Sequence, residues 1–128
     1  TMNISLNLWW LIPGLFLLLF FTIGVSTLFA SLNVKYRDIN FIVQAIISLW
    51  FYATPIVYSL DMVPNFLKSI IYLNPLSLIV EVIRFSLSGY PVTNVLEKLA
   101  INLTISSVVF IIALVVFKKE NRNFDDWM

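Results

Sequence analysis

The chain has 128 residues, of which 60% are hydrophobic and only 12% are charged, and its formal net charge is +1. A soluble domain of this length carries about twice that share of charged residues, so the composition indicates an integral membrane protein. The chain has no cysteine and no histidine. This excludes disulfides, thiolate chemistry and the usual zinc sites, and we predict no metal site.

The first apolar segment, residues 8–32, is long enough to cross a bilayer as one helix. Two tryptophans near its start are typical of a membrane interface. Thr22, Ser26 and Ala30 recur at four-residue spacing. Such a stripe of small residues lets another helix approach closely, so we expect this face to pack against a helix.

The second apolar segment, residues 41–60, has about the length of one crossing. Pro55 lies in its interior and is expected to kink the helix, because proline cannot donate the hydrogen bond to the carbonyl of Phe51. Trp50, Phe51 and Tyr52 fall near the middle of this segment. Anchoring at the membrane interface therefore does not explain these aromatic side chains.

The third crossing is predicted at residues 95–117, where Asn102 and Ser106 share one face that should turn toward protein. The break at residues 33–40 contains Lys35 and Arg37, and three more basic residues follow the third crossing. Residues 61–98 contain only three basic residues, although this range is much longer. The positive-inside rule therefore places loop 33–40 and the C-terminus in the cytoplasm, which three crossings satisfy.

Residues 64–88, between the second and third crossings, are predicted to form two short helices. Asn74 and Pro75 resemble an N-cap followed by proline at the first helical position, and Gly89 resembles a C-terminal stop. A helix of about 14 residues is roughly 21 Å long, too short for a crossing. We therefore expect a re-entrant hairpin on the external side. The alternative is an amphipathic hairpin lying flat on the membrane.

One polar stripe runs along the second of these short helices, formed by Ser77, Glu81, Arg84 and Ser88. Glu81 and Arg84 are three residues apart and can pair, which would lower the cost of burying either charge. The fold class predicted from the whole sequence is an all-α integral membrane protein. It has three transmembrane helices and an external re-entrant helical hairpin between the second and third.

The motifs of several enzyme classes are missing from the sequence. It has no G-x-x-x-x-G-K-[ST] motif, so it does not bind ATP through a P-loop. No close pair of acidic residues lies inside an apolar segment, as a membrane-embedded glycosyltransferase, phosphatase or protease would need. We therefore predict that the chain is not an enzyme and that any ATP hydrolysis takes place in another subunit.

Four stretches together resemble the ABC-2 type permeases that export O-antigen, capsule and teichoic-acid polysaccharides. They are "NVKYRDI", "FYATPIVYSLDMVP", "LNPLSLIVEVIR" and "FKKENRNFDD", in this order along the chain. Members of this family are about twice as long and have six crossings. The resemblance therefore implies that residues 1–128 correspond to the C-terminal half, as a fragment, a truncated frame or one piece of a split permease.

The resemblance also implies roles for particular residues. Lys35, Tyr36, Arg37 and Asp38 would form a cytoplasmic loop that couples to the ATPase subunit. The hairpin with Asn74, Pro75, Glu81 and Arg84 would form the external gate. The aromatic residues Trp50, Phe51, Tyr52 and Tyr58 would line the channel, where their rings could contact sugars; helix packing explains these aromatics equally well.

The partners implied by the resemblance are membrane lipid, a separate ABC ATPase that holds ATP and Mg²⁺, a second permease copy, the missing N-terminal half and a glycan or glycolipid substrate. Nucleic acid is not among them. The expected location is the bacterial cytoplasmic membrane. The alternative function is a small non-transporting adaptor, or a permease remnant, that docks on a partner. Charge reversal at Arg37 or Asp38 separates the two, because only a transporter would become uncoupled.

Overall fold

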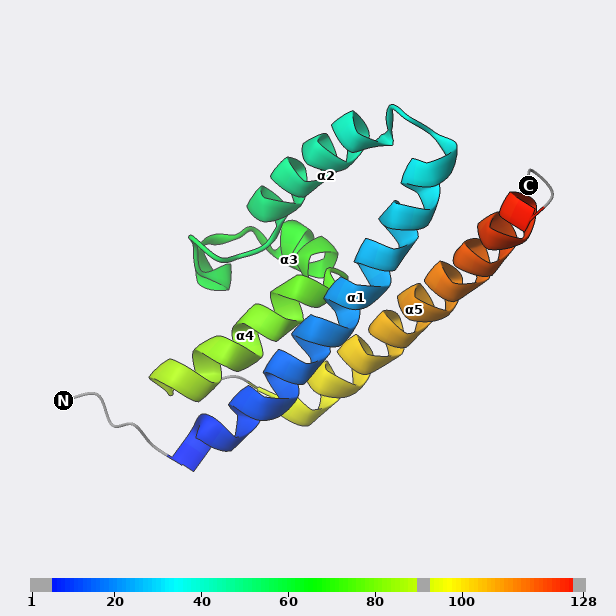
Figure 1. Ribbon diagram of the computed structural model, residues 1–128. Helices are drawn as coiled ribbons and strands as arrows, with labels where there is room; N and C mark the ends of the chain where they lie inside the picture. Colours follow the sequence, from blue (N-terminus) through cyan, green and yellow to red (C-terminus); the bar gives the residue numbers. More distant parts are fainter. Residues whose placement is uncertain (1–5, 90–92, 126–128) are drawn as a thin grey trace.

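The computed structural model describes residues 6–89 and 93–125, and every regular element within these ranges is a helix. The elements follow one another as η1 (Leu6–Trp10), α1 (Leu11–Lys35), α2 (Ile39–Ala53), η2 (Leu60–Met62), α3 (Asn65–Tyr72), α4 (Pro75–Ser88) and α5 (Val95–Asp125), as Figure 1 shows. The predicted all-α fold is confirmed for this part of the chain. Residues 126–128, the end of the predicted cytoplasmic tail, lie outside it.

Helices α1 and α5 lie side by side and run in the same direction (Figure 1). Their C-terminal ends are joined by an ion pair, in which the Lys35 Nζ lies 3.6 Å from the Glu120 Oε1. The loop after α1 and the C-terminal part of α5 are therefore at the same end of the bundle. The predicted topology requires this arrangement, because it places loop 33–40 and the C-terminus on the same side of the membrane.

Two helices have the length and composition of membrane spans, residues Leu8–Lys35 and Val95–Arg122, each with 28 residues. Their outer faces carry large apolar side chains that are exposed, among them Phe16, Leu19 and Ile111. A soluble protein rarely exposes contiguous apolar surface on this scale, whereas lipid requires it. The predicted first and third crossings are thus present as single helices. The third continues to Asp125, beyond the predicted end at residue 117.

Glycines allow the three central helices to approach closely. A Cβ atom added to Gly24 of α1 would lie 3.4 Å from the backbone nitrogen of Phe110 in α5. One added to Gly14 would lie 3.4 Å from the Cγ1 of Val82 in α4. Because lipid is as apolar as the side chains themselves, close packing of this kind supplies much of the attraction between membrane helices.

The predicted helix-packing stripe on α1 is wrong for the contacts within this chain. Thr22, Ser26 and Ala30 are all exposed, and α5 packs on the face of α1 that carries Gly24. The three residues do lie on one face of α1, as their spacing predicts. Helix α5 instead packs on the face with Gly24, because glycine has no side chain and lets a neighbouring backbone come closer.

The predicted second crossing at residues 41–60 is also wrong as a continuous helix. Helix α2 ends at Ala53 after 15 residues, so it is roughly 22 Å long, shorter than a bilayer core of about 30 Å. Thr54 has an extended backbone with φ −97° and ψ 127°. A residue before proline is driven out of the helical region, so Pro55 ends the helix and does not kink it.

The two short helices predicted at residues 64–88 are present, and α3 and α4 meet at an angle of 96°. Asn74 caps α4, since its Oδ1 accepts a hydrogen bond from the Leu76 N–H at 3.1 Å, and Pro75 is the first helical residue. Gly89 ends α4 with a left-handed φ of 64°. The predicted start and stop signals of this helix are confirmed.

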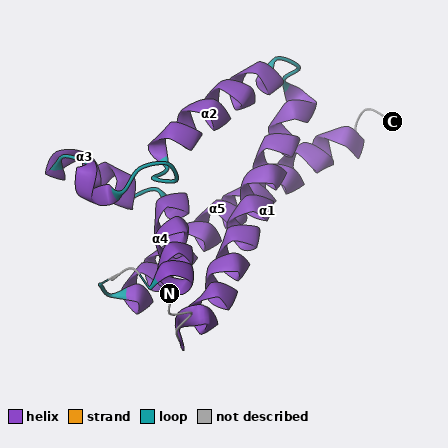
Figure 2. Cartoon of the chain, turned by 90° about the vertical axis from the view of Figure 1, so that its left-hand side faces the viewer, coloured by secondary structure: helices purple, strands orange, loops and turns teal. Residues whose placement is uncertain are grey.

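Helix α4 lies along the N-terminal half of α1. Its start is close to the middle of α1, where the rings of Phe21 and Trp50 are 5.8 Å apart and Trp50 bonds Asn74. Its later residue Val82 packs by Gly14, near the start of α1. Figures 1 and 2 show α4 running back along α1 in this way. The pair α3–α4 has the geometry of a broken span or a re-entrant loop.

The contact between α1 and α5 can be tested at Gly24. Gly24→Leu should destabilise the protein by about 1–3 kcal/mol, because the added side chain must push the two helices apart. Thermal unfolding in detergent measures the effect. The exposed neighbour Ile23 provides the control, and Ile23→Leu should change the melting temperature little. Equal effects of the two substitutions would contradict this packing.

Candidate functional site

A cluster of hydrogen bonds joins the end of α2 to the start of α4; we call Trp50, Thr54, Asn74 and Pro75 the polar junction. The Trp50 Nε1 donates to the Asn74 Oδ1 at 2.9 Å, and the Asn74 Nδ2 donates to the Thr54 Oγ1 at 3.1 Å. The Thr54 hydroxyl donates to the Trp50 carbonyl at 2.9 Å. Asn74 therefore caps α4 and holds α2 with the same side chain.

Helix α5 contacts the polar junction through the face predicted from the sequence. The Asn102 Nδ2 donates to the Pro75 carbonyl at 2.6 Å, and the Ser106 hydroxyl donates to the Asn102 Oδ1 at 3.0 Å. Asn102 and Ser106 are both buried. The prediction that these two residues turn toward protein is confirmed, and their partner is the first residue of α4.

Arg84 of α4 binds the backbone that follows α2. Its Nη2 donates to the carbonyl oxygens of Pro55, at 3.0 Å, and Ile56, at 3.3 Å. The backbone at Pro55 and Ile56 is not helical, so its carbonyl groups have no partner within a helix and need other donors. The guanidinium supplies two such bonds at once, which makes Arg84 a structural partner of the break at Pro55.

The predicted pairing of Glu81 with Arg84 is wrong. The Glu81 Oε2 accepts a hydrogen bond from the Nζ of Lys98, in the first turn of α5, and both side chains are largely buried. The Lys98 Nζ also lies 5.1 Å from the centre of the Tyr72 ring at the end of α3. Three residues of spacing permit a pair within one helix, but here each charge has a closer partner on another segment.

The four predicted channel aromatics do not share one surface. Trp50 is half-buried and its N–H is used by Asn74, whereas Phe51 and Tyr52 are exposed. The Tyr58 hydroxyl donates to the Tyr52 carbonyl at 3.1 Å and so helps to close the end of α2. The contact of Trp50 is structural, and contact of any of the four with a sugar stays a prediction.

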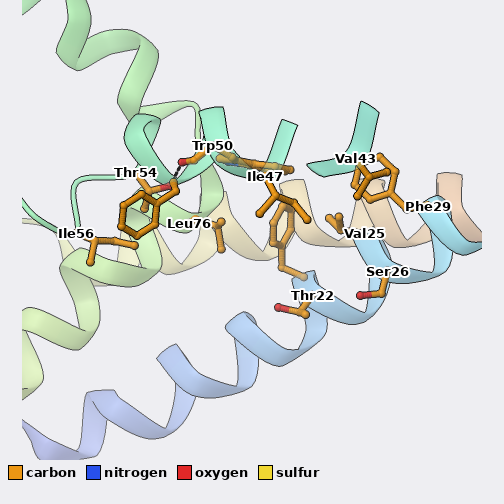
Figure 3. A pocket seen from close by; sticks show the side chains of 12 residues that line it. Thr22, Val25, Ser26, Phe29, Val43, Ile47, Trp50, Thr54, Ile56 and Leu76 are labelled. Carbon is orange, nitrogen blue, oxygen red and sulfur yellow. Dashed lines mark hydrogen bonds between the residues drawn. The ribbon is translucent and has the colours of Figure 1, made fainter. Parts of the chain in front are cut away.

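An apolar hollow of about 450 Å³ lies between α1 and α2, and we call it the α1–α2 groove. Figure 3 shows side chains of the two helices lining it, with Thr54, Ile56 and Leu76 at one end. Helix α2 separates from α1 with distance from the loop that joins them, as the view in Figure 2 shows. The groove is lined by Phe21, Thr22, Val25, Ser26, Phe29, Val43, Ile47, Trp50, Phe51, Thr54, Ile56 and Leu76.

The predicted coupling residues are all exposed and lie in or beside the loop between α1 and α2. Lys35 is the last residue of α1, and its Nζ lies 5.5 Å from the centre of the Tyr36 ring. The loop is short, because α2 begins at Ile39, directly after Asp38. A partner that contacts Arg37 or Asp38 would therefore act on both helices.

Sequence reasoning missed two residues that the structure places in this network, Thr54 and Lys98. A threonine before proline at the end of an apolar helix carries a hydroxyl that can bond the carbonyl four residues earlier, and Thr54 does so. Lys98 is the basic residue closest to the start of the third apolar segment. Its charge signals a need for an acidic partner, but nothing in the sequence identifies Glu81 as that partner.

The geometry defines a helical membrane protein whose short helices are held against two spanning helices by polar contacts. The profile of the ABC-2 type transporter family matches residues 1–88. The chain belongs to the ABC-2 type transporter family.

Several curated relatives are permeases by name. The chain is 35% identical over 125 residues to an O-antigen export system permease protein RfbA of Klebsiella pneumoniae, a match that covers 96% of this chain and 47% of the relative. A second protein of that name from the same species is 47% identical over 57 residues, covering 44% of this chain and 22% of the relative. A protein of that name from Myxococcus xanthus is 38% identical over 45 residues, a match that covers 35% of this chain and 17% of the relative. The chain thus spans about half the length of the first relative.

The ion pair between Glu81 and Lys98 can be tested by removing its partners singly and together. Lys98→Met leaves a largely buried carboxylate without its cation and should cost about 3 kcal/mol of stability. Adding Glu81→Leu should restore most of that loss, because no unpaired charge remains. Thermal unfolding in detergent measures both variants.

The exposed pair at the other end of the bundle provides the matched control. Lys35→Met removes a cation that is about half exposed, so the loss should stay below about 1 kcal/mol. If Lys98→Met were as mild as Lys35→Met, the Glu81–Lys98 contact would not hold α4 to α5.

Proposed function

We propose that this chain is the C-terminal half of the permease subunit of an ATP-driven exporter that moves lipid-linked polysaccharide out across the bacterial cytoplasmic membrane. The observation that carries the proposal is the 35% identity to an O-antigen export permease across 96% of the chain. The remaining length of that relative leaves room for a further half with its own spans. A second copy of the complete permease would complete the channel.

The energy would come from a separate ABC ATPase that binds ATP and Mg²⁺, since the sequence has no P-loop motif. The proposed contact for that subunit is the loop formed by Lys35, Tyr36, Arg37 and Asp38. Two features support this choice: its side chains are exposed, and it joins two helices without a flexible linker. The excess of basic residues at this end of the bundle supports a cytoplasmic location.

A path from the loop to the external gate follows from the contacts of α2. Helix α2 begins at Ile39, directly after the loop, and ends at the polar junction, which it shares with α4. A helix acts as a stiff rod, so displacement of its first turn is transmitted to its last turn. In the proposed mechanism, closure of the ATPase moves α2, and the polar junction passes this movement to the hairpin α3–α4.

The hairpin is the proposed external gate because its contacts bring several segments together near the N-terminal end of α1. Glu81 and Arg84 each bond a partner within the chain. Their proposed role is to hold the gate to α5 and to the end of α2. Exposed aromatics such as Phe51 and Tyr52 are the proposed sugar contacts in the assembled channel.

Charge reversal in the loop tests the proposal. In the complete permease with its ATPase, Arg37→Glu or Asp38→Lys should reduce polysaccharide export by about tenfold while the amount of permease in the membrane is unchanged. The cause would be weaker coupling between ATP hydrolysis and the helices. Export is measured as polysaccharide at the cell surface, together with ATPase activity of the purified complex.

Lys119→Glu provides the control, because Lys119 is exposed near the same end of the bundle but lies outside the loop. This variant should export normally. Normal export by both loop variants would contradict the coupling role of the loop.

A further inference from the structure

The α1–α2 groove is built from one face of each helix. On α1 the lining residues Phe21, Val25 and Phe29 recur every four positions, and on α2 Val43 and Ile47 do the same. Each wall therefore extends over at least one to two helical turns, roughly 6–12 Å along the helix axis. An elongated apolar occupant aligned with the two helices fits this shape.

The groove offers few free hydrogen-bonding groups to an occupant. None of its lining residues is charged, and the Thr22 hydroxyl donates to the Leu18 carbonyl of its own helix at 2.7 Å. Thr54 and Trp50 use their donors within the polar junction. A glycan placed here would lose hydrogen bonds to water without replacing them, so the groove does not suit the sugar part of a substrate.

Helix α2 has no buried residue, although its composition is strongly apolar. Ile47 remains 56% exposed and Phe51 49% exposed, even though both line the groove. On the opposite wall, Thr22 and Ser26 are small and exposed, which lets a backbone approach α1 closely. A surface of this kind fits another apolar helix.

The occupant follows from the length of the relatives. This chain covers 47% of the permease to which it is 35% identical. We propose that the α1–α2 groove accommodates a transmembrane helix from the other half of the permease, with small and aliphatic side chains and no charge on the face that enters. This inference rests on the proposed function only in taking the chain as part of a permease of that length.

The test uses the complete permease together with its ATPase in native membranes. A diazirine analogue of leucine, which is close in size to the residues it replaces, is placed at Val25 of α1 or at Ile47 of α2. After irradiation, the peptides attached to each position are identified by mass spectrometry. Leu49 provides the control, since it is 72% exposed on α2 but does not line the groove.

The proposal predicts that Val25 and Ile47, on facing walls, capture the same apolar peptide from outside residues 1–128, and that Leu49 does not. Capture of phospholipid alone at both groove positions would overturn it, as would capture of residues 1–128 of a second copy. Export is measured in the same membranes. Normal export with lipid adducts rejects only the groove occupant, whereas failure of the unmodified complex to export rejects the proposed function.

Discussion

The end of α2 at Thr54 and Pro55 is the constraint on which the arrangement of the short helices depends. A helix that stops alongside the middle of α1 exposes backbone carbonyls to a setting where water is scarce. The Tyr58 hydroxyl donates to one of these groups, the Tyr52 carbonyl, and Arg84 donates to the carbonyls of Pro55 and Ile56 in the non-helical segment that follows. The position of α4 follows, because Arg84 must reach back to this break while Asn74 caps the first turn.

The same contacts divide the molecule into a tightly packed part and a loosely covered part. Helices α1, α4 and α5 meet through glycines and through Asn102, Ser106 and the Glu81–Lys98 pair. Helix α2 is held mainly at its two ends, by the loop and by the polar junction, and between them the groove remains open. Such a helix suits a role in which a signal at one end must reach the other, and its uncovered face suits a further helix of the same permease.

Much of the fold followed from local signals in the sequence. The two long spans have continuous apolar composition, and Asn74, Pro75 and Gly89 mark the ends of α4 by chemistry that depends only on neighbouring residues. The predictions were wrong where contacts between residues far apart in the sequence determine the structure. Spacing allowed Glu81 to bind Arg84, but tertiary packing brought Lys98 and the Pro55 carbonyl closer. Pro55 could kink or end a helix, and the extended backbone of Thr54 together with the donors around it favoured the end.

The hydrogen bond between Trp50 and Asn74 joins α2 to the hairpin. A double-mutant cycle with Trp50→Phe, Asn74→Ala and both together, followed by thermal unfolding in detergent, tests it most directly. We predict a coupling energy of about 1 kcal/mol, so that the double variant loses less stability than the sum of the single variants. The control combines Asn74→Ala with Trp9→Phe at the exposed Trp9, where the losses should add. Additive losses for Trp50→Phe and Asn74→Ala would show that these two side chains do not hold α2 to the hairpin.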